Sequence, residues 1–130
     1  MNARIRLLVP TAGKQPASEM ADAVISIAKN LAADLVPLHI VRDGETEAAA
    51  LQGPLVLTEA ARDAGINAMP ATRHGQVVDV IIDTAERFEV NLIVMGVSEG
   101  RVVNQWLSAD VMKRCQVPVV VIPGPATRRL

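Results

Sequence analysis

The sequence predicts a doubly wound α/β fold built on a parallel sheet. Three observations predict it. The length of 130 residues suits one domain, half of the residues are hydrophobic although only 2% are aromatic, and short apolar runs alternate with helical patterns. Continuous apolar runs are typical of strands that are buried on both faces, and parallel strands need right-handed crossovers. We therefore expect residues 1–130 to form one domain with helices on both faces of the sheet.

The expected strands are apolar runs rich in Val, Ile and Leu. Turn residues end them, as Pro123-Gly124-Pro125 does after the last run. The third run contains Pro70, which makes it the weakest, because proline cannot donate to a strand ladder. The five expected strands comprise residues 5–10, 35–41, 66–72, 91–96 and 117–122.

Helical spacing of apolar residues fills the segments between these runs. The first helix is expected to begin near Pro16 or Ala17 and to end near Leu31. Gly53-Pro54 is expected to interrupt the next segment, because proline suits the first turn of a new helix. The expected helices comprise residues 16–31, 55–64 (after a helix-prone stretch at 45–51), 76–88 and a part of 102–115. In the third helix, the expected inward residues are Val77, Val78, Ile81, Ala85 and Phe88.

Charge and composition exclude several classes of protein. There are 13 basic and 14 acidic residues, so no broad field attracts nucleic acid or an anionic membrane. Phe88 and Trp106 are the two aromatic residues, too few for a base-stacking platform. The single Cys115 cannot form an internal disulfide and is expected to be a small buried hydrophobe. No apolar stretch approaches the ~20 residues of a membrane helix. We expect a cytoplasmic protein with no nucleic-acid or membrane partner.

The sequence contains one motif that suggests catalysis. Residues 96–100 spell G-x-S-x-G, the pattern of a hydrolase nucleophile elbow around Ser98. A serine triad of that fold needs a histidine after the serine, yet His39 and His74 both precede it. Neither histidine has metal-ligand spacing, so each is expected to be structural. We therefore expect no catalytic residue and no metal site.

The runs and the turns after them resemble the universal stress protein family. Residues 5–14 resemble that family's opening I-L-V-P-V-D-G-S, residues 38–41 its strand L-H-V-V, and residues 91–96 its strand D-L-I-V-M-G. Residues 117–121 are similar to its final C-P-V-L-V-V. The resemblance implies a flavodoxin-like or Rossmann-like sheet of five strands in the order 3-2-1-4-5. It also implies a homodimer through the last strand, here Val117, Val119 and Val121.

Many members of that family bind ATP through an Asp after the first strand and G-x2-G-x9-G-[S/T] after the fourth. Ala12 stands at the Asp position here, and Gly96 matches the first glycine. Glu99, Ala109 and Asp110 stand at the second glycine, the third glycine and the hydroxyl position. We expect these changes to disfavour ATP, because two unit charges ~4 Å apart near a surface repel by about 1–4 kcal/mol.

The resemblance places the candidate cofactor-binding residues after the first, second and fourth strands. Five match positions that line the adenosine pocket, and four others offer hydrogen-bond donors or positive charge. Asp110 is expected either to cap the last helix in place of a ligand phosphate or to lie exposed on a face of that helix. The candidates are Pro10, Thr11, Lys14, Val41, Met95, Gly96, Ser98, Gly100, Arg101 and Asp110.

Three functions follow from these observations. The first is a regulatory or adaptor protein of the stress response that does not hydrolyse ATP, is not an enzyme and acts on a protein partner. The alternative is an adenine-nucleotide binder, with ATP or AMP held by donors such as Thr11, Lys14 and Arg101. The third is a serine esterase that uses Ser98. The sequence predicts no cofactor other than these two candidate nucleotides.

Overall fold

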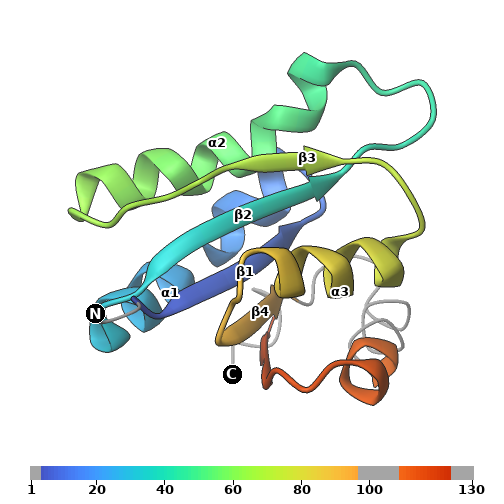
Figure 1. Ribbon diagram of the computed structural model, residues 1–130. Helices are drawn as coiled ribbons and strands as arrows, with labels where there is room; N and C mark the ends of the chain where they lie inside the picture. The colour runs from blue at the N-terminus through green and yellow to red at the C-terminus, as the bar shows by residue number, and fades with distance from the viewer. Residues whose placement is uncertain (1–3, 97–108, 124–130) are drawn as a thin grey trace.

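Five parallel strands form one sheet in the order β3-β2-β1-β4-β5 in the computed structural model, which describes residues 4–96 and 109–123 (Figure 1). This order confirms the topology that the family resemblance implies. Residues 109–114 are also helical. The named elements are β1 (Arg6–Thr11), α1 (Lys14–Leu31), β2 (Asp34–Ile40), α2 (Glu47–Asp63), β3 (Ala71–Arg73), α3 (Val77–Arg87), β4 (Leu92–Gly96) and β5 (Val119–Ile122).

Helices cover both faces of the sheet (Figure 1). Helices α1 and α2 pack on one face, and α3 packs on the other together with the helical residues 109–114. Each face has its own apolar cluster, which includes Met20 and Leu57 on the first and Ile81 and Val111 on the second. The protein therefore has three layers, as expected for a doubly wound sheet.

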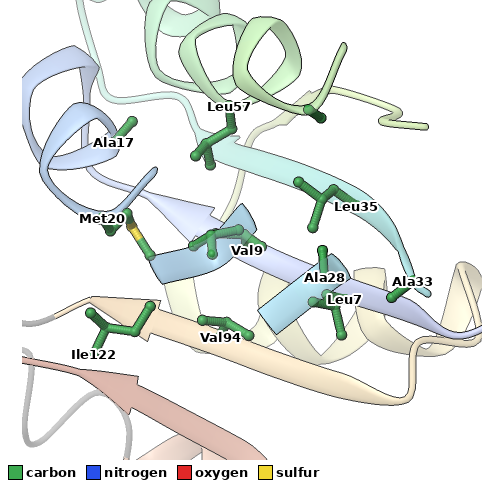
Figure 2. Packing of buried hydrophobic residues seen from close by; sticks show 12 residues of the cluster. Leu7, Val9, Ala17, Met20, Ala28, Ala33, Leu35, Leu57, Val94 and Ile122 are labelled. Atoms are coloured by element: carbon green, nitrogen blue, oxygen red, sulfur yellow. The ribbon is translucent and has the colours of Figure 1, made fainter. Parts of the chain in front are cut away.

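Strand β1 shows why its sequence is continuously apolar. Leu7 and Val9 belong to the cluster under α1 and α2, where Figure 2 shows them among their neighbours, and Leu8 belongs to the opposite cluster. All three are fully buried. Because successive side chains of a strand point to opposite faces, a strand covered on both sides needs apolar residues at every position. Burial of each side chain contributes about 1.5–3 kcal/mol.

The predicted interruption of the second helix at Gly53-Pro54 is wrong. Helix α2 runs without a break from Glu47 to Asp63 and contains Pro54. A proline inside a helix removes one amide, here the donor to the carbonyl of Ala50. Buried residues on both sides of the proline, among them Leu57, hold the helix on the sheet through this defect.

Three strand or helix boundaries also differ from the predictions. Helix α1 begins at Lys14, two to three residues earlier than expected. Strand β3 is reduced to residues 71–73, and only an isolated bridge between Leu35 and Ala68 precedes it. Proline explains this loss, because Pro70 has no amide for the ladder. Strand β5 begins at residue 119, so Val117 lies before it.

Two predicted burial positions are wrong as well. Val77, the first residue of α3, is 39% exposed, although it was expected to face inward. The buried face of α3 instead includes Val80 and Thr84. Cys115 is half-buried and packs at the edge of the cluster under α3.

Candidate functional site

The order of the sheet reverses between β1 and β4. From β1 the chain continues to β2 and β3 on one side, and β4 and β5 lie on the other side. Ligands of such sheets bind at the carboxyl ends of the strands on either side of this switch point. These ends are Thr11 of β1 and Gly96 of β4, so the candidate site lies at this edge.

The turn between β1 and α1 is shaped by a glycine. Gly13 has a φ of 134°, which an L side chain rarely adopts, and its carbonyl accepts the amide of Ala17 at 3.1 Å. No side chain caps the first turn of α1, and that turn holds no acidic residue. The side chains of Thr46 and Gln76, in contrast, cap α2 and α3. The first turn of α1 thus keeps a positive end that favours an anion, with the exposed Lys14 beside it.

Helix α2 lies directly against this turn through a second glycine. A Cβ at Gly53 would lie 2.7 Å from Thr11 Oγ1 and 3.0 Å from the carbonyl oxygen of Gly13. No side chain fits at such distances. Gly53 therefore permits the close approach of α2, and α2 in turn fixes the position of the β1–α1 turn.

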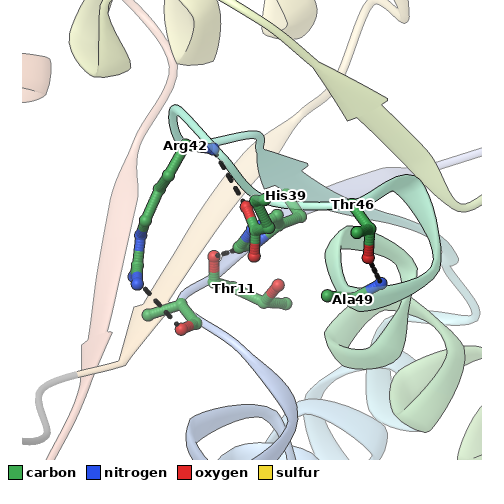
Figure 3. A network of polar contacts seen from close by, with 7 residues as sticks. Thr11, His39, Arg42, Thr46 and Ala49 are labelled. Carbon is green, nitrogen blue, oxygen red and sulfur yellow. Dashed lines mark hydrogen bonds and ion pairs between the residues drawn. The ribbon is translucent and has the colours of Figure 1, made fainter.

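A buried histidine supports the same turn from the β2 side, as Figure 3 shows. His39 of β2 is only 2% exposed. Its Nδ1 lies 3.3 Å from the carbonyl oxygen of Thr11, and its Nε2 lies 2.9 and 3.0 Å from the two carboxyl oxygens of Glu45. His39 therefore joins the end of β1 to the segment that follows β2.

The chain returns toward His39 through a tight turn. Gly44 has a φ of 81°, and the amide of Glu45 donates to the carbonyl of Arg42 at 3.0 Å. The Glu45 carboxylate in turn accepts the amide of Arg42 at 2.9 Å. This amide and, after it, the ring of His39 hold the pKa of Glu45 below its usual value of 4.5. Glu45 is therefore a carboxylate at neutral pH.

Arg42 extends from this turn to the β1–α1 turn. Its Nη2 donates to the carbonyl oxygen of Ala12 at 3.4 Å (Figure 3). Ala12 is the residue that stands at the family's Asp position. A cation thus contacts the backbone of the residue at the family's Asp position, and the exposed Lys14 follows two residues further along the chain.

Residues 4–123 match the sequence profile of the universal stress protein family. The chain belongs to the universal stress protein family. A comparison with curated proteins found no match. Family membership agrees with the resemblance that the strands and turns of the sequence suggest, and it covers every part of the site described above.

Solved structures of universal stress proteins share this fold. One in complex with cAMP superposes with a TM-score of 0.75 at 20% identity, over 94% of this chain and 98% of that chain. One from Archaeoglobus fulgidus in complex with dAMP superposes with a TM-score of 0.72 at 16% identity, over 94% of this chain and 99% of that chain. One from Burkholderia pseudomallei superposes with a TM-score of 0.70 at 25% identity, over 92% of this chain and 96% of that chain. The first two comparisons show the fold alone.

The sequence-predicted site residues of this universal stress protein lie at different depths. Thr11 ends β1, with its hydroxyl oxygen buried and without a hydrogen-bond partner among the described residues. Val41 follows β2, and its amide donates to the carbonyl of Arg73 at 2.8 Å. Pro10 is half-buried in β1, and Met95 of β4 is 5% exposed and packs in the cluster under α3.

Gly96 has a packing role in addition to its place in the motif. A Cβ at Gly96 would lie 3.3 Å from Sδ of Met20 in α1. Asp110 is exposed within the helical residues 109–114, so it is not the residue that begins that helix. Ser98, Gly100 and Arg101 lie outside the described residues, and their roles stay predictions.

The structure identifies site residues that the sequence did not. His39 was expected to be structural, Gly53 was expected only to interrupt a helix, and Arg42 and Glu45 were assigned no role. The signal for Glu45 is the Asp43-Gly44 turn after β2, which reverses the chain toward its own strand. Gly53 carries no signal in the sequence, because only the packing of α2 on the β1–α1 turn requires it.

Metal-binding clusters and membrane-spanning helices are the last features to consider. Within residues 4–96 and 109–123, no group of three or more His, Cys, Asp or Glu side chains is arranged to hold a metal ion. None of the helices in the same ranges combines the length and the apolar character needed to cross a membrane.

Proposed function

We propose that this universal stress protein is a regulatory protein that binds an adenosine monophosphate at the carboxyl ends of β1 and β4 and does not hydrolyse ATP. The uncapped first turn of α1, beside Lys14 and Arg42, carries this proposal. Both side chains are cations that suit a phosphate.

The known ligands of similar folds support a monophosphate. The two structures described above contain cAMP and dAMP, which are both monophosphates of adenosine or deoxyadenosine. A monophosphate needs less charge compensation and less space than a triphosphate. The changed glycine pattern after β4 therefore matters less for this ligand class.

Three residues argue against ATP as the ligand. Ala12 has no carboxylate to accept hydrogen bonds from ribose or adenine, and Ala109 adds a Cβ where the family pattern has glycine. Asp110 adds an exposed negative charge in the helix after β4. The changes at Ala109 and Asp110 disfavour the longer phosphate chain, whereas the change at Ala12 removes a contact from any adenine nucleotide.

Calorimetry with AMP, cAMP and ATP tests the proposal. We expect AMP or cAMP to bind and to raise the melting temperature; a ligand at a hundred times its Kd stabilises a protein by about 2.7 kcal/mol. Lys14→Gln should weaken AMP binding about two- to fivefold, the range for one exposed charge pair. Lys29→Gln, which removes an exposed cation from the last turn of the same helix, is the matched control.

Two results would contradict the proposal. If no adenine nucleotide binds at millimolar concentration, the protein acts through its surfaces as an adaptor without this ligand. If ATP binds more tightly than AMP and is hydrolysed, the proposed ligand class is wrong.

A further inference from the structure

The ring of His39 lies between two hydrogen-bond acceptors. Nδ1 points to the carbonyl oxygen of Thr11, and Nε2 points to both carboxyl oxygens of Glu45 (Figure 3). A neutral imidazole carries one N–H and can donate to only one of them. The imidazolium carries two and can donate to both at once. The geometry therefore matches the protonated ring.

The neutral ring would leave one contact unfavourable. With the proton on Nε2, the lone pair of Nδ1 would face the carbonyl oxygen of Thr11 at 3.3 Å. With the proton on Nδ1, the lone pair of Nε2 would face the carboxylate of Glu45 at 2.9 Å. His39 is almost fully buried, so water cannot easily replace the lost hydrogen bond.

We propose that His39 is a protonation-dependent positioning residue that holds the β1–α1 turn in the form that binds the nucleotide. As an imidazolium it ties the end of β1 to Glu45, and Glu45 ties this point to the backbone of Arg42. The effect on ligand affinity rests on the proposed function, whereas the protonation and the order of the turn do not.

The carboxylate of Glu45 also holds Arg42, which lies three residues earlier in the turn. Glu45 binds the amide of Arg42, and the guanidinium of Arg42 donates to the carbonyl oxygen of Ala12. Gly53 of α2 packs against Thr11 and Gly13 in the same turn. Loss of the His39 contact thus removes one of the contacts that hold the turn, while the contact with α2 remains.

Other charged groups lie on the elements around His39. Its own strand leads to Arg42 and Glu45, α1 begins with Lys14, and the first turn of α2 contains Glu47. Its partner in β1 is Thr11 and its partner in β3 is Thr72, and neither is charged. Among the described residues, Glu45 is the one charged group in hydrogen-bond contact with the ring.

The pH dependence has two sides. Deprotonation of His39 would remove the hydrogen bond to Thr11 or to Glu45. As the pH falls, Glu45 gains a proton; since its pKa is lowered in the folded protein, this loss occurs only in acid. The turn should therefore be best ordered, and AMP should bind best, at intermediate pH.

NMR of the two histidine rings tests the protonation state directly. The chain has only His39 and His74, and His74 is exposed, so the two sets of ring signals are separable. We expect ring ¹⁵N shifts of two N–H groups for His39 at neutral pH. In Glu45→Gln, which keeps an acceptor but removes the charge, the share of His39 rings with two N–H groups at this pH should fall.

Amide exchange and AMP affinity test the effect on the turn. The amides of Ala17 and Arg42 donate to Gly13 and to Glu45 and report on the turn. We expect their protection, taken relative to the intrinsic exchange rate at each pH, to fall about tenfold when His39 is neutral, and AMP affinity to fall about fivefold, the lower end of coupling between sites. His39→Gln should remove the pH dependence of this protection and of AMP affinity. His74→Gln is the matched control and should leave both unchanged. If His39→Gln does not fold, Glu45→Gln replaces it in both measurements.

The outcomes separate the two proposals. Two N–H groups on His39 and pH-dependent exchange of the turn support the positioning role even if AMP does not bind, which would overturn only the proposed function. A His39 ring with one N–H at neutral pH overturns the positioning role. Protection of the Ala17 and Arg42 amides that is the same in the wild type and Glu45→Gln at every pH also overturns it.

Discussion

Gly53 is the residue at which a single methyl group should matter most. In an exposed helix, Gly→Ala stabilises by about 1 kcal/mol. Here the new Cβ would lie 2.7 Å from Thr11 Oγ1 and 3.0 Å from a backbone oxygen. We expect Gly53→Ala to lower the free energy of unfolding by about 1–3 kcal/mol, the usual cost of overpacking, as measured by urea denaturation.

The exposed neighbour Gln52 supplies a control in the same helix. Gln52→Ala changes helix propensity without adding an atom to the packed interface, so stability should change by less than about 0.5 kcal/mol. If Gly53→Ala proves as stable as the wild type, α2 does not constrain the β1–α1 turn as the distances imply.

Asp110 is the residue predicted to discriminate against a triphosphate. Asp110→Ser restores the hydroxyl that the family pattern has at this position and removes one negative charge. We expect ATP binding to become measurable by calorimetry, with affinity raised about tenfold or more, because a repulsion of about 1–4 kcal/mol is removed.

An exposed aspartate of α1 provides the control for Asp110. Asp22→Ser also changes the net charge by one, but it lies two turns after the start of α1. It should leave ATP affinity unchanged. If the Asp110→Ser variant still binds no ATP, the charge of Asp110 is not what excludes the triphosphate.

Helix α2 depends on its N-terminal cap. Thr46 Oγ1 accepts the amide of Ala49 at 3.1 Å, which satisfies an amide that has no partner within the helix. Thr46→Ala should lower the free energy of unfolding by about 0.5–2 kcal/mol, measured by denaturant titration. It should also loosen the segment that carries Glu45.

Thr58 provides the same substitution in the interior of α2. Its hydroxyl donates to the carbonyl of Pro54 at 2.8 Å and caps nothing. Thr58→Ala should therefore cost less than Thr46→Ala. An equal loss in both variants would mean that the cap contributes no more than any buried hydroxyl of this helix.

Helix and strand boundaries show how far the sequence predicts an element. The start of α1 was missed because its N-cap is Gly13, with a φ of 134° and no side chain to serve as a signal. The continuity of α2 was missed because burial on both sides of Pro54 outweighs the one lost hydrogen bond. Element type follows from hydrophobic period, whereas the exact bounds depend on neighbours that lie far away in the sequence.

Strand β5 forms one edge of the sheet among the residues that the structure describes. Val121 in this edge strand is an apolar residue and is 42% exposed. If the protein dimerises through this strand, Val121→Lys should convert the dimer to a monomer in analytical ultracentrifugation. Leu55→Lys, at a residue of α2 that is 44% exposed, should leave the dimer intact.

A dimer that persists in Val121→Lys would place the interface elsewhere. Of the three residues predicted for the interface, Val119 and Val121 lie in β5, and Val117 lies before it. Val119→Lys is a weaker test, because this side chain is half-buried against the cluster under α3.

The stability of the whole molecule should fall in acid. The hydrogen bond from Arg73, and after it that from Arg87, hold the pKa of Asp83 below its usual value of 3.8. A carboxyl with a lowered folded-state pKa stabilises the protein above its unfolded pKa, and this contribution is lost as the pH falls through the folded value. Asp83→Asn should therefore flatten the decline of thermal stability below about pH 4.

The control for this pH profile is Asp22→Asn. Asp22 is exposed and makes no ion pair within residues 4–96 and 109–123, so its variant should keep the wild-type slope. A slope that is the same for Asp83→Asn and the wild type would mean that the pair with Arg73 forms no better in the folded protein than in the unfolded chain.

The sequence by itself determined the architecture of this protein. Short continuous apolar runs and longer runs with apolar residues at helical spacing are local patterns, and a parallel sheet covered on both faces buries both. The sequence also predicted candidate binding residues after the first, second and fourth strands, and the proposed site rests on them. Tertiary structure decided what lies there. The two acceptors around His39, the reach of Arg42 to Ala12 and the contact of Gly53 with the β1–α1 turn all join segments that are distant in the chain, and only folding brings such atoms within bonding distance.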